Sequence, residues 1–331
     1  MAIAAQRRVA AGEVPVIDIG SLGDASASEA AVGAEIRRAC EATGFFYIAN
    51  HGIAVGTLAE LFAQSRRFFA LPLATRQAVH LTRSMAYRGY LPIGERGADR
   101  ARKPDLLESF TIGRELGPDD PAVRAGVPLH GPNQWPEGLP GFREFLLDYH
   151  GQLDRLAHRL LVGFALALDL PRDALDASHR DPINSIRLLH YPPQPDAEFE
   201  FLGARPHTDT GTFTILLQDE HLGLEVADRD GEWMVVPPIP GTFVINIAEV
   251  MTAWTNGRFA SARHRVINAY GADRYSAPFF VNPDYDALIA PLPGFVDAAH
   301  PPAFAPYRAG DALHTLFRNL WPGAGQVDSA A

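Results

Sequence analysis

The chain has 331 residues, of which 47% are hydrophobic, so it has ample material for a buried core. Its formal net charge of −10 and the lack of any long run of Lys and Arg in the sequence exclude an electrostatic surface for nucleic acid. A single cysteine, Cys40, excludes an internal disulfide framework and a thiolate metal cage.

The N-terminal sequence MAIAAQRRVAAGEVPVIDIG has no long apolar stretch typical of a signal peptide. The longest apolar run, LLVGFALAL at residues 160–168, is too short to span a membrane. Together with the lone cysteine, these features predict a cytoplasmic protein without a membrane partner.

The first half of the chain is predicted to be mainly helical over residues 14–125. Apolar side chains recur with helical spacing over 27–43 and 54–78, and the sequence between them, GFFYIANHGI, predicts a short strand closed by a turn. From residue 138 apolar side chains recur every three or four positions, which predicts a helix of about 30 residues over 138–170, ending before Pro171. This long helix is expected to support a sheet.

Beyond residue 183 the pattern changes to short strands separated by turn pairs such as Asp230-Gly231 and Asn256-Gly257. The predicted strands are NSIRLLHY, TFTILLQ, GLEVAD, EWMVVPP, TFVINI, HRVIN and YSAPFFV. Strands at this spacing predict an antiparallel jelly roll over 183–285, followed by a C-terminal segment over 286–331. With no clear linker, we expect a mainly β fold with flanking α-helices in one compact unit, residues 1–331.

A candidate metal site begins with His207 and Asp209, two positions apart in RPHTDTGTFTILLQD. Singly, these could be a turn Asp and a strand His, so their meaning depends on a third ligand. His264, in SARHRVIN late in the predicted jelly roll, is the candidate. Two imidazoles and a carboxylate hold one face of an octahedral ion and leave three positions open, as in non-haem iron(II) oxygenases. A closed zinc site would want a fourth ligand, preferably sulfur.

Arg274 and Ser276 in DRYSAPFF fall on one face of a predicted strand, because side chains alternate with period two. A guanidinium and a hydroxyl can anchor one carboxylate of a dicarboxylic acid while its 2-oxo acid end chelates iron. The pair therefore indicates 2-oxoglutarate, although a solvated strand edge would also accommodate both residues.

Taken together, these motifs resemble the isopenicillin N synthase-like branch of iron(II)/2-oxoglutarate-dependent dioxygenases, and we expect a bacterial member. The resemblance runs from VPVIDIG at 14–20 to about residue 320 and includes RLLHYPPQP, HTDTGTFTILLQD and RYSAPFF. It implies a distorted double-stranded β-helix, a cupin-like jelly roll, with an N-terminal helical region. It also implies Fe(II), 2-oxoglutarate and O2 as cofactor and co-substrates. The ligands implied for iron are His207, Asp209 and His264, and those for 2-oxoglutarate are Arg274, Ser276 and Tyr191.

The sequence departs from the family pattern at two positions. Plant members usually carry asparagine two residues before the matching tyrosine, whereas Leu189 stands here, which indicates one fewer hydrogen bond to the co-substrate. Thr210 replaces a tyrosine often found after the H-x-D triplet, which indicates a roomier or more polar pocket.

In similar proteins the substrate pocket is lined by the YRGY region, the strand that leads to Tyr191 and the C-terminal helix. This resemblance points to residues near Leu316 and to four candidates, which are Arg88, Tyr90, Ser185 and Arg187. The two arginines suit an acidic small molecule, such as a carboxylate or an amino-acid-like compound, or they could pair with surplus surface carboxylates.

The expected reaction is hydroxylation, desaturation or cyclisation at an unactivated C–H bond, with 2-oxoglutarate and O2 converted to succinate and CO2. Two alternatives are an iron-dependent oxidase on the same scaffold that uses no 2-oxoglutarate, and a non-catalytic cupin-like metal or ligand binder. A zinc hydrolase is disfavoured, because the Arg-x-Ser pair has no task there and no general base is evident.

Overall fold

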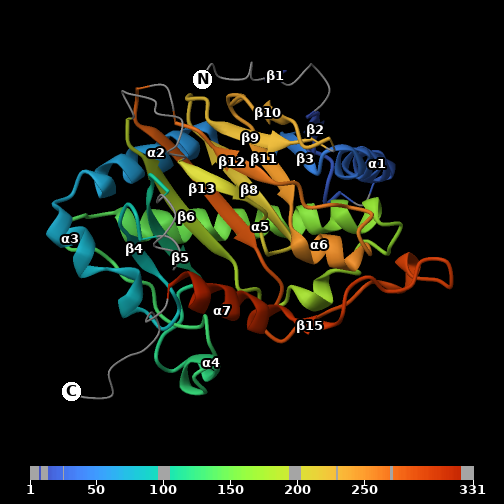
Figure 1. Cartoon of the computed structure of the whole chain (residues 1–331). Coiled ribbons are helices and arrows are strands. Elements are labelled where there is room, and N and C mark those ends of the chain that lie inside the picture. Colours follow the sequence, from blue (N-terminus) through green and yellow to red (C-terminus); the bar gives the residue numbers. More distant parts are fainter. Residues whose placement is uncertain are drawn as a thin grey trace.

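The computed structural model describes residues 7–8, 14–24, 26–95, 105–193, 203–228, 230–268 and 271–321. Within these residues, two facing β-sheets form a jelly roll flanked by helices, and the predicted mainly β class is confirmed (Figure 1). The large sheet has eight strands in the order β2-β3-β11-β8-β13-β6-β5-β4, and the small sheet has five in the order β1-β10-β9-β12-β7.

Each of the strands predicted beyond residue 183 is present. In sheet order, the large sheet comprises β2 (Val16–Asp18), β3 (Phe45–Ala49), β11 (Phe243–Ile247), β8 (Phe213–Gln218), β13 (Arg274–Val281), β6 (Ser185–Tyr191), β5 (Glu108–Gly113) and β4 (Gly89–Leu91). The small sheet comprises β1 (Arg7–Arg8), β10 (Trp233–Val235), β9 (Leu224–Ala227), β12 (His264–Val266) and β7 (Ala204–His207). A separate pair is formed by β14 (Leu288–Ile289) and β15 (Tyr307–Arg308).

The N-terminal part of the chain contributes more strand than its helical pattern indicates, because β2, β3, β4 and β5 all join the large sheet. Every residue of β5 is buried, so this strand lacks the alternation by which a half-exposed strand is recognised.

The helices are α1 (Ala27–Ala42), α2 (Val55–Phe69), α3 (Leu73–Ala78), α4 (Pro121–Arg124), α5 (Phe142–Ala167), α6 (Glu249–Trp254) and α7 (Ala309–Leu320). Short 3-10 turns are η1 (Leu81–Arg83), η2 (Asp176–Ser178) and η3 (Pro293–Phe295).

Two predicted helix boundaries differ from the structure. The single helix predicted over 54–78 is wrong, because it divides into α2 and α3 at Pro72, the N-cap residue of α3. A proline disfavours helical geometry in the residue before it and has no N–H to continue the helix. The long helix α5 begins at Phe142 rather than at 138, because Gly141 takes a left-handed conformation with φ 79°.

The two faces of the large sheet have different roles. In β13, Tyr275, Ala277 and Phe279 belong to the core shared with α1, α2 and α5, whereas Arg274 and Ser276 face the space between the sheets. The helix α5 runs across this sheet (Figure 1), and its His150 packs on Phe279 with ring centroids 5.2 Å apart. Burial of each large apolar side chain in this core contributes about 2 kcal/mol. The helical layer therefore holds the sheet from one side and leaves the other for the site.

The space between the sheets is filled at one end by a second apolar core. It includes Phe45 of β3, Leu216 of β8, Val226 of β9 and Val244 of β11. The other end is a cavity. None of the helices in the described part of the chain is both long and apolar enough to cross a membrane.

Candidate metal centre

The three candidate ligands come from one pair of neighbouring strands and the loop that follows. His207 is the last residue of β7, His264 is the first of β12, and the two lie opposite each other in antiparallel register. Opposite residues project on the same face, so the imidazole centroids are only 4.3 Å apart. Asp209 lies just beyond β7, where the chain turns towards β8.

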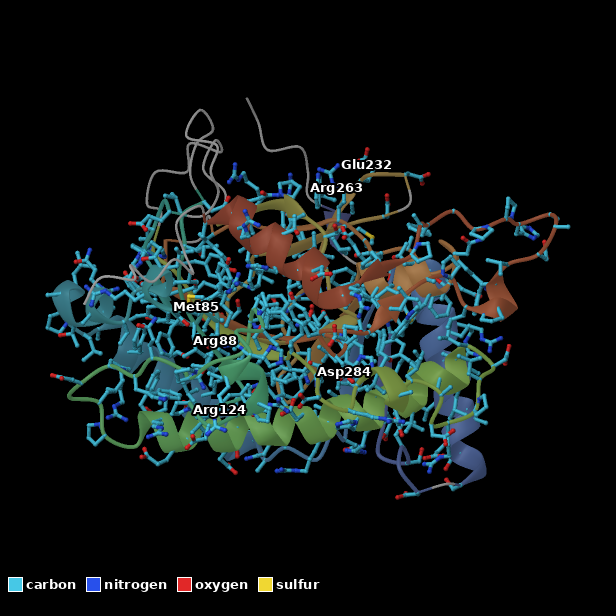
Figure 2. All side chains as sticks on the ribbon, turned by 90° about the horizontal axis from the view of Figure 1, so that it is seen from below. Met85, Arg88, Arg124, Glu232, Arg263 and Asp284 are labelled. Atoms are coloured by element: carbon cyan, nitrogen blue, oxygen red, sulfur yellow. The ribbon has the colours of Figure 1, made fainter. Side chains whose placement is uncertain are left out.

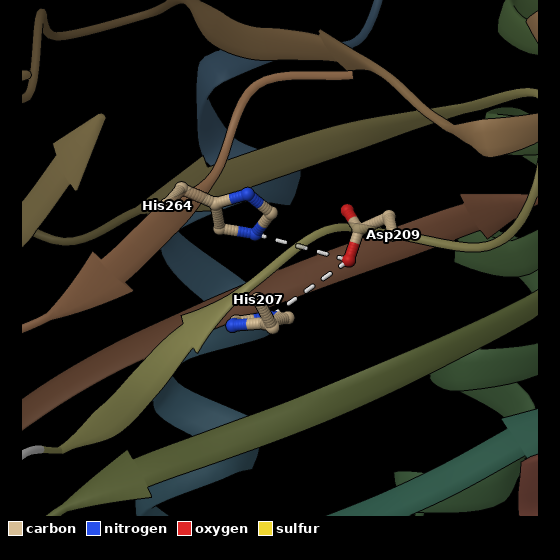
Figure 3. A group of neighbouring side chains, drawn as sticks. All are labelled: His207, Asp209 and His264. Carbon is tan, nitrogen blue, oxygen red and sulfur yellow. Dashed lines mark ion pairs between the residues drawn. The ribbon is translucent and has the colours of Figure 1, made fainter. Parts of the chain in front are cut away.

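Both imidazoles face one carboxylate oxygen (Figure 3). Oδ1 of Asp209 lies 3.9 Å from Nε2 of His207 and 3.8 Å from Nε2 of His264. All three ligand atoms lie within 4.8 Å of one another. Small side-chain rotations would bring them to the bond lengths of about 2.1 Å that nitrogen and oxygen make with a transition metal.

Hydrogen bonds orient each ligand atom. Nδ1 of His207 donates to the carbonyl of Arg205 at 2.7 Å, and Nδ1 of His264 donates to the carbonyl of Ala262 at 3.3 Å. A carbonyl only accepts, so the proton resides on Nδ1 and the lone pair of Nε2 faces the centre.

The carboxylate of Asp209 is held in the same way. Its Oδ2 accepts from Oγ1 of Thr214 at 2.5 Å and from Nδ2 of Asn246 at 2.8 Å, which leaves Oδ1 for a metal. Burial alone would raise the pKa of Asp209, but the positive charge that His264 and His207 carry when they are protonated, together with these two hydrogen bonds, outweighs it, and the pKa is lowered. The carboxylate is thus charged, as a metal ligand must be.

A second acidic group, Asp219, Glu220 and His221, also has ligand spacing. The carboxylate of Asp219 already accepts two hydrogen bonds. Its Oδ2 accepts from the backbone N–H of Tyr275 at 2.6 Å, and its Oδ1 accepts from the backbone N–H of His221 at 3.0 Å. These contacts close a turn after β8, and Glu220 is exposed. The geometry therefore favours the first group as the metal centre.

An inner cavity extends from the candidate ligands between the sheets, and it is also lined by Tyr191, Arg274 and Ser276. Arg274 is only 1% exposed. Its Nη2 donates to Oε1 of Gln218 at 2.9 Å, and its guanidinium lies 5.0 Å from the centre of the Tyr191 ring. Gly223 leaves room for it, since a Cβ there would come within 2.8 Å of Nε.

The remaining donors of Arg274 have no partner within the described residues, since Nε and Nη1 are both buried and unbonded. A buried cation with unused donors is costly unless an anion is supplied. This guanidinium therefore fits a carboxylate that enters the inner cavity, and the donor set of two imidazoles and a carboxylate fits iron(II).

An outer cavity lies on the other side of the candidate ligands, between them and α7. Ser185, Arg187 and Thr210 line it, and Leu313 and Phe317 of α7 form its far wall. Arg187 also lines the inner cavity. Its Nε donates to Oγ1 of Thr111 at 3.1 Å, and its guanidinium lies 5.5 Å from the ring centres of both Phe280 and Trp321.

Arg88 and Tyr90 do not line either cavity. The prediction that they contact the substrate is therefore wrong. Tyr90 is 1% exposed, and its hydroxyl donates to Oε2 of Glu108 at 2.5 Å. Arg88, labelled in Figure 2, is only 6% exposed and has its guanidinium over Gly113, and burial lowers its pKa to about 10. The YRGY region leads into β4 at the edge of the large sheet, and only Gly89 and Tyr90 of it lie on that strand.

Three residues that orient the site were not predicted from the sequence. Thr214 and Asn246 orient the metal ligand Asp209, and Gln218 orients Arg274. A signal for two of them was present, because Thr214 and Gln218 lie at even spacing along β8, on the face that also carries Leu216 in the inner cavity. Asn246 on β11 is brought to Asp209 only by strand pairing, in which it lies opposite Thr214.

The chain is similar to known proteins over nearly its whole length. Residues 14–138 match the model of the N-terminal region of non-haem dioxygenases in morphine synthesis, and residues 182–283 match the 2OG-Fe(II) oxygenase superfamily. A 2-oxoglutarate-Fe(II) type oxidoreductase of Emericella nidulans is 35% identical, over 93% of this chain and 90% of that protein.

Solved structures agree with these matches. A full-length Neurospora crassa protein in complex with alpha-KG superimposes with a TM-score of 0.82 and 27% identity, over 92% of this chain and 95% of that one. A putative 2OG-Fe(II) oxygenase family protein from Caulobacter crescentus gives a TM-score of 0.81 and 30% identity, over 92% of this chain and 98% of that one.

Proposed function

The chain belongs to the 2OG-Fe(II) oxygenase superfamily, and from this premise we propose which residues bind the metal, the co-substrate and the substrate. It is an iron(II)- and 2-oxoglutarate-dependent dioxygenase that oxidises a small molecule. Iron(II), when bound, supplies the activation of dioxygen and the oxidative decarboxylation of 2-oxoglutarate to succinate and CO2.

Iron(II) is held by Nε2 of His207, Oδ1 of Asp209 and Nε2 of His264. These three atoms lie within 4.8 Å of one another, and His207 and Asp209 line both the inner and the outer cavity. A facial set of this kind leaves positions for the co-substrate and for dioxygen together. The chain's part is to fix the ligand atoms through Arg205, Thr214 and Asn246.

The distal carboxylate of 2-oxoglutarate is bound by Arg274 and Ser276. The observation that carries this assignment is the buried guanidinium with two unused donors in the same cavity as the metal ligands. Ser276 lies two residues further along β13 on the same face and adds a hydroxyl donor. The ring of Tyr191 packs under the guanidinium and closes one side of the cavity.

The substrate enters the outer cavity, between the metal ligands and α7. Its wall of Leu313 and Phe317 fits an apolar body and excludes water, and Ser185 and Arg187 supply the polar contacts. We assign an acidic substrate, a small carboxylate or amino-acid-like compound, because Arg187 lines both cavities and brings a positive charge there, with its guanidinium 5.5 Å from the ring centres of Phe280 and Trp321. A guanidinium at this place would hold a carboxylate at a fixed distance from the metal.

Four broader predictions remain proposals. The match over residues 14–138 supports placing the chain in the isopenicillin N synthase-like branch. The division into a helical region (14–125), a supporting helix (138–170), a jelly roll (183–285) and a C-terminal segment (286–331) is a separate prediction. A bacterial source and a cytoplasmic location also stay predictions. The buried free thiol of Cys40 is in keeping with a reducing compartment.

The substrate assignment is tested by screening small carboxylates and their uncharged amides for stimulated release of succinate from 2-oxoglutarate. We expect stimulation by acids, and we expect Arg187→Leu to raise KM for the best acid while leaving 2-oxoglutarate binding intact. Stimulation by uncharged compounds that is insensitive to Arg187→Leu would show that this arginine does not select the substrate.

A further inference from the structure

A buried polar network lies on the helix-facing side of the large sheet, outside both cavities. Glu108 of β5 is 5% exposed and accepts hydrogen bonds from the hydroxyl of Tyr90 at 2.5 Å and from Arg76 of α3. His190 of β6 joins this network, with Nδ1 at 2.8 Å from Oε1 of Glu108 and Nε2 at 2.7 Å from Oδ1 of Asp273.

The position of His190 in the sheet relates it to the co-substrate residues. His190 lies opposite Glu108 on one side and Tyr275 on the other, so it is the middle residue of a row across β5, β6 and β13. The next row along these strands pairs Tyr191 with Arg274. Because successive side chains alternate, His190 and Asp273 point away from the inner cavity while their chain neighbours Tyr191 and Arg274 point into it.

The His190 ring is held tightly in this row. It stacks on the Tyr275 ring with centroids 4.8 Å apart and planes 14° apart, and it contacts Phe69 of α2 at 5.3 Å. Both ring nitrogens have a carboxylate oxygen as partner. A neutral imidazole donates through one nitrogen only, so the full set of bonds requires the imidazolium form.

The charges around the ring favour that form. The groups that face the ring are Glu108 from β5, Tyr275 from β13, Asp273 from the segment before β13, and Arg76 from α3. Arg66 of α2 also lies nearby, 5.3 Å from the centre of the Tyr275 ring. Burial lowers the pKa of His190, but the hydrogen bonds and charges of Glu108 and Asp273 outweigh it and raise the pKa above its ordinary value. Glu108 stays charged. Burial would raise its pKa, but His190, Tyr90 and Arg76 together lower it.

We propose that His190 is a positioning residue for 2-oxoglutarate. By bridging Glu108 and Asp273, His190 holds β6 and β13 in the register that sets Arg274 against Tyr191. The inference rests on the proposed placement of the co-substrate at Arg274. The bridge is complete while the imidazolium persists, and it is lost as the pH rises through the raised pKa of His190.

The test is anaerobic calorimetric titration of 2-oxoglutarate into the iron(II)-loaded protein, from about pH 6 to about pH 9, a range that extends above the ordinary pKa of histidine because the pKa of His190 is raised. The variant is His190→Gln, which keeps a polar side chain but cannot be protonated. At the acid end we expect its dissociation constant to exceed that of the unmodified protein on the order of three- to thirty-fold, the size of effect seen for residues that act on a site without touching its ligand. The difference should narrow as the pH rises.

His300→Gln is the matched control, since His300 is an exposed histidine that also contacts a carboxylate, that of Asp297. It should leave the titration unchanged. Glu108→Gln, which keeps a polar partner for Tyr90, should weaken binding in the same direction as His190→Gln.

Equal affinity and equal pH dependence in His190→Gln and the unmodified protein would overturn the inference. Arg274→Leu, measured alongside, separates the two levels of the argument. If Arg274→Leu loses affinity while His190→Gln does not, only the positioning role fails. If Arg274→Leu binds normally, the co-substrate placement itself is wrong and the inference falls with it.

Discussion

The side-chain amide of Asn246 donates to Oδ2 of Asp209 at 2.8 Å, whereas the other carboxylate oxygen, Oδ1, is the one that faces the two histidines. Thr214 donates to the same oxygen. The two donors come from β11 and β8, which are neighbours in the large sheet, whereas the histidines come from the small sheet. The geometry of the metal centre therefore depends on how the two sheets are packed together.

Loss of one of these donors should weaken metal binding without removing a ligand. We expect Thr214→Val to lower the affinity for iron(II) about 10- to 100-fold, because the carboxylate can then rotate and lose its orientation. Competition with a chelator measures this change. Thr214→Ser, which keeps the hydroxyl, should stay close to the unmodified protein, and a loss of equal size in both variants would show that the hydroxyl has no orienting role.

Gln218 fixes the guanidinium of Arg274 through Nη2, so its replacement should act on 2-oxoglutarate and not on iron. Gln218→Leu removes one hydrogen bond, worth about 1 kcal/mol, and should raise the dissociation constant of 2-oxoglutarate about five-fold. Gln218→Glu should weaken binding further, because its carboxylate would compete with the co-substrate for the same cation. Calorimetry on the iron(II)-loaded protein distinguishes the two, and tighter binding in Gln218→Glu would contradict the account.

The packing of the helices behind the large sheet leads us to predict an effect on stability. A Cβ added to Gly33 of α1 would lie 2.7 Å from Cβ of Leu166 in α5, so the two helices would have to separate. We expect Gly33→Ala to lower the free energy of unfolding by about 1–3 kcal/mol. Urea denaturation measures the loss.

Gly56 of α2 is the matched comparison, because nothing lies within 4 Å of an added Cβ there. Gly56→Ala should leave stability unchanged or raise it by up to about 1 kcal/mol, as alanine favours a helix. A stable Gly33→Ala protein would mean that the contact between α1 and α5 is looser than the structure shows.

The sequence carries much of the sheet and of the candidate site because both follow local periodicity. Period-two alternation places Arg274 and Ser276 on one face of β13, and the structure directs that face into the cavity. The H-x-D triplet keeps His207 and Asp209 together through chain connectivity alone. His264 joins them because β12 pairs with β7, and the H-x-D triplet itself carries no sign of this pairing.

What could not be predicted depends on which surfaces meet in three dimensions. The buried strand β5 has no alternation to reveal it, and the edge strand β4 takes its orientation from β5. Tyr90 therefore faces Glu108 and the helices, a direction that the YRGY sequence does not specify. His190 shows no motif at all, since its partners are Glu108 of β5 and Asp273 of the segment before β13, both distant in the sequence.

The central claim is that His207, Asp209 and His264 form the iron site. Anaerobic equilibrium dialysis with iron(II) tests it most directly, with His264→Ala compared with His221→Ala, whose histidine belongs to the second acidic group. We predict that the unmodified protein and His221→Ala retain a single iron(II) per chain, whereas His264→Ala retains almost none although its circular dichroism is native. Full iron retention in His264→Ala, or its loss in His221→Ala alone, would contradict the account.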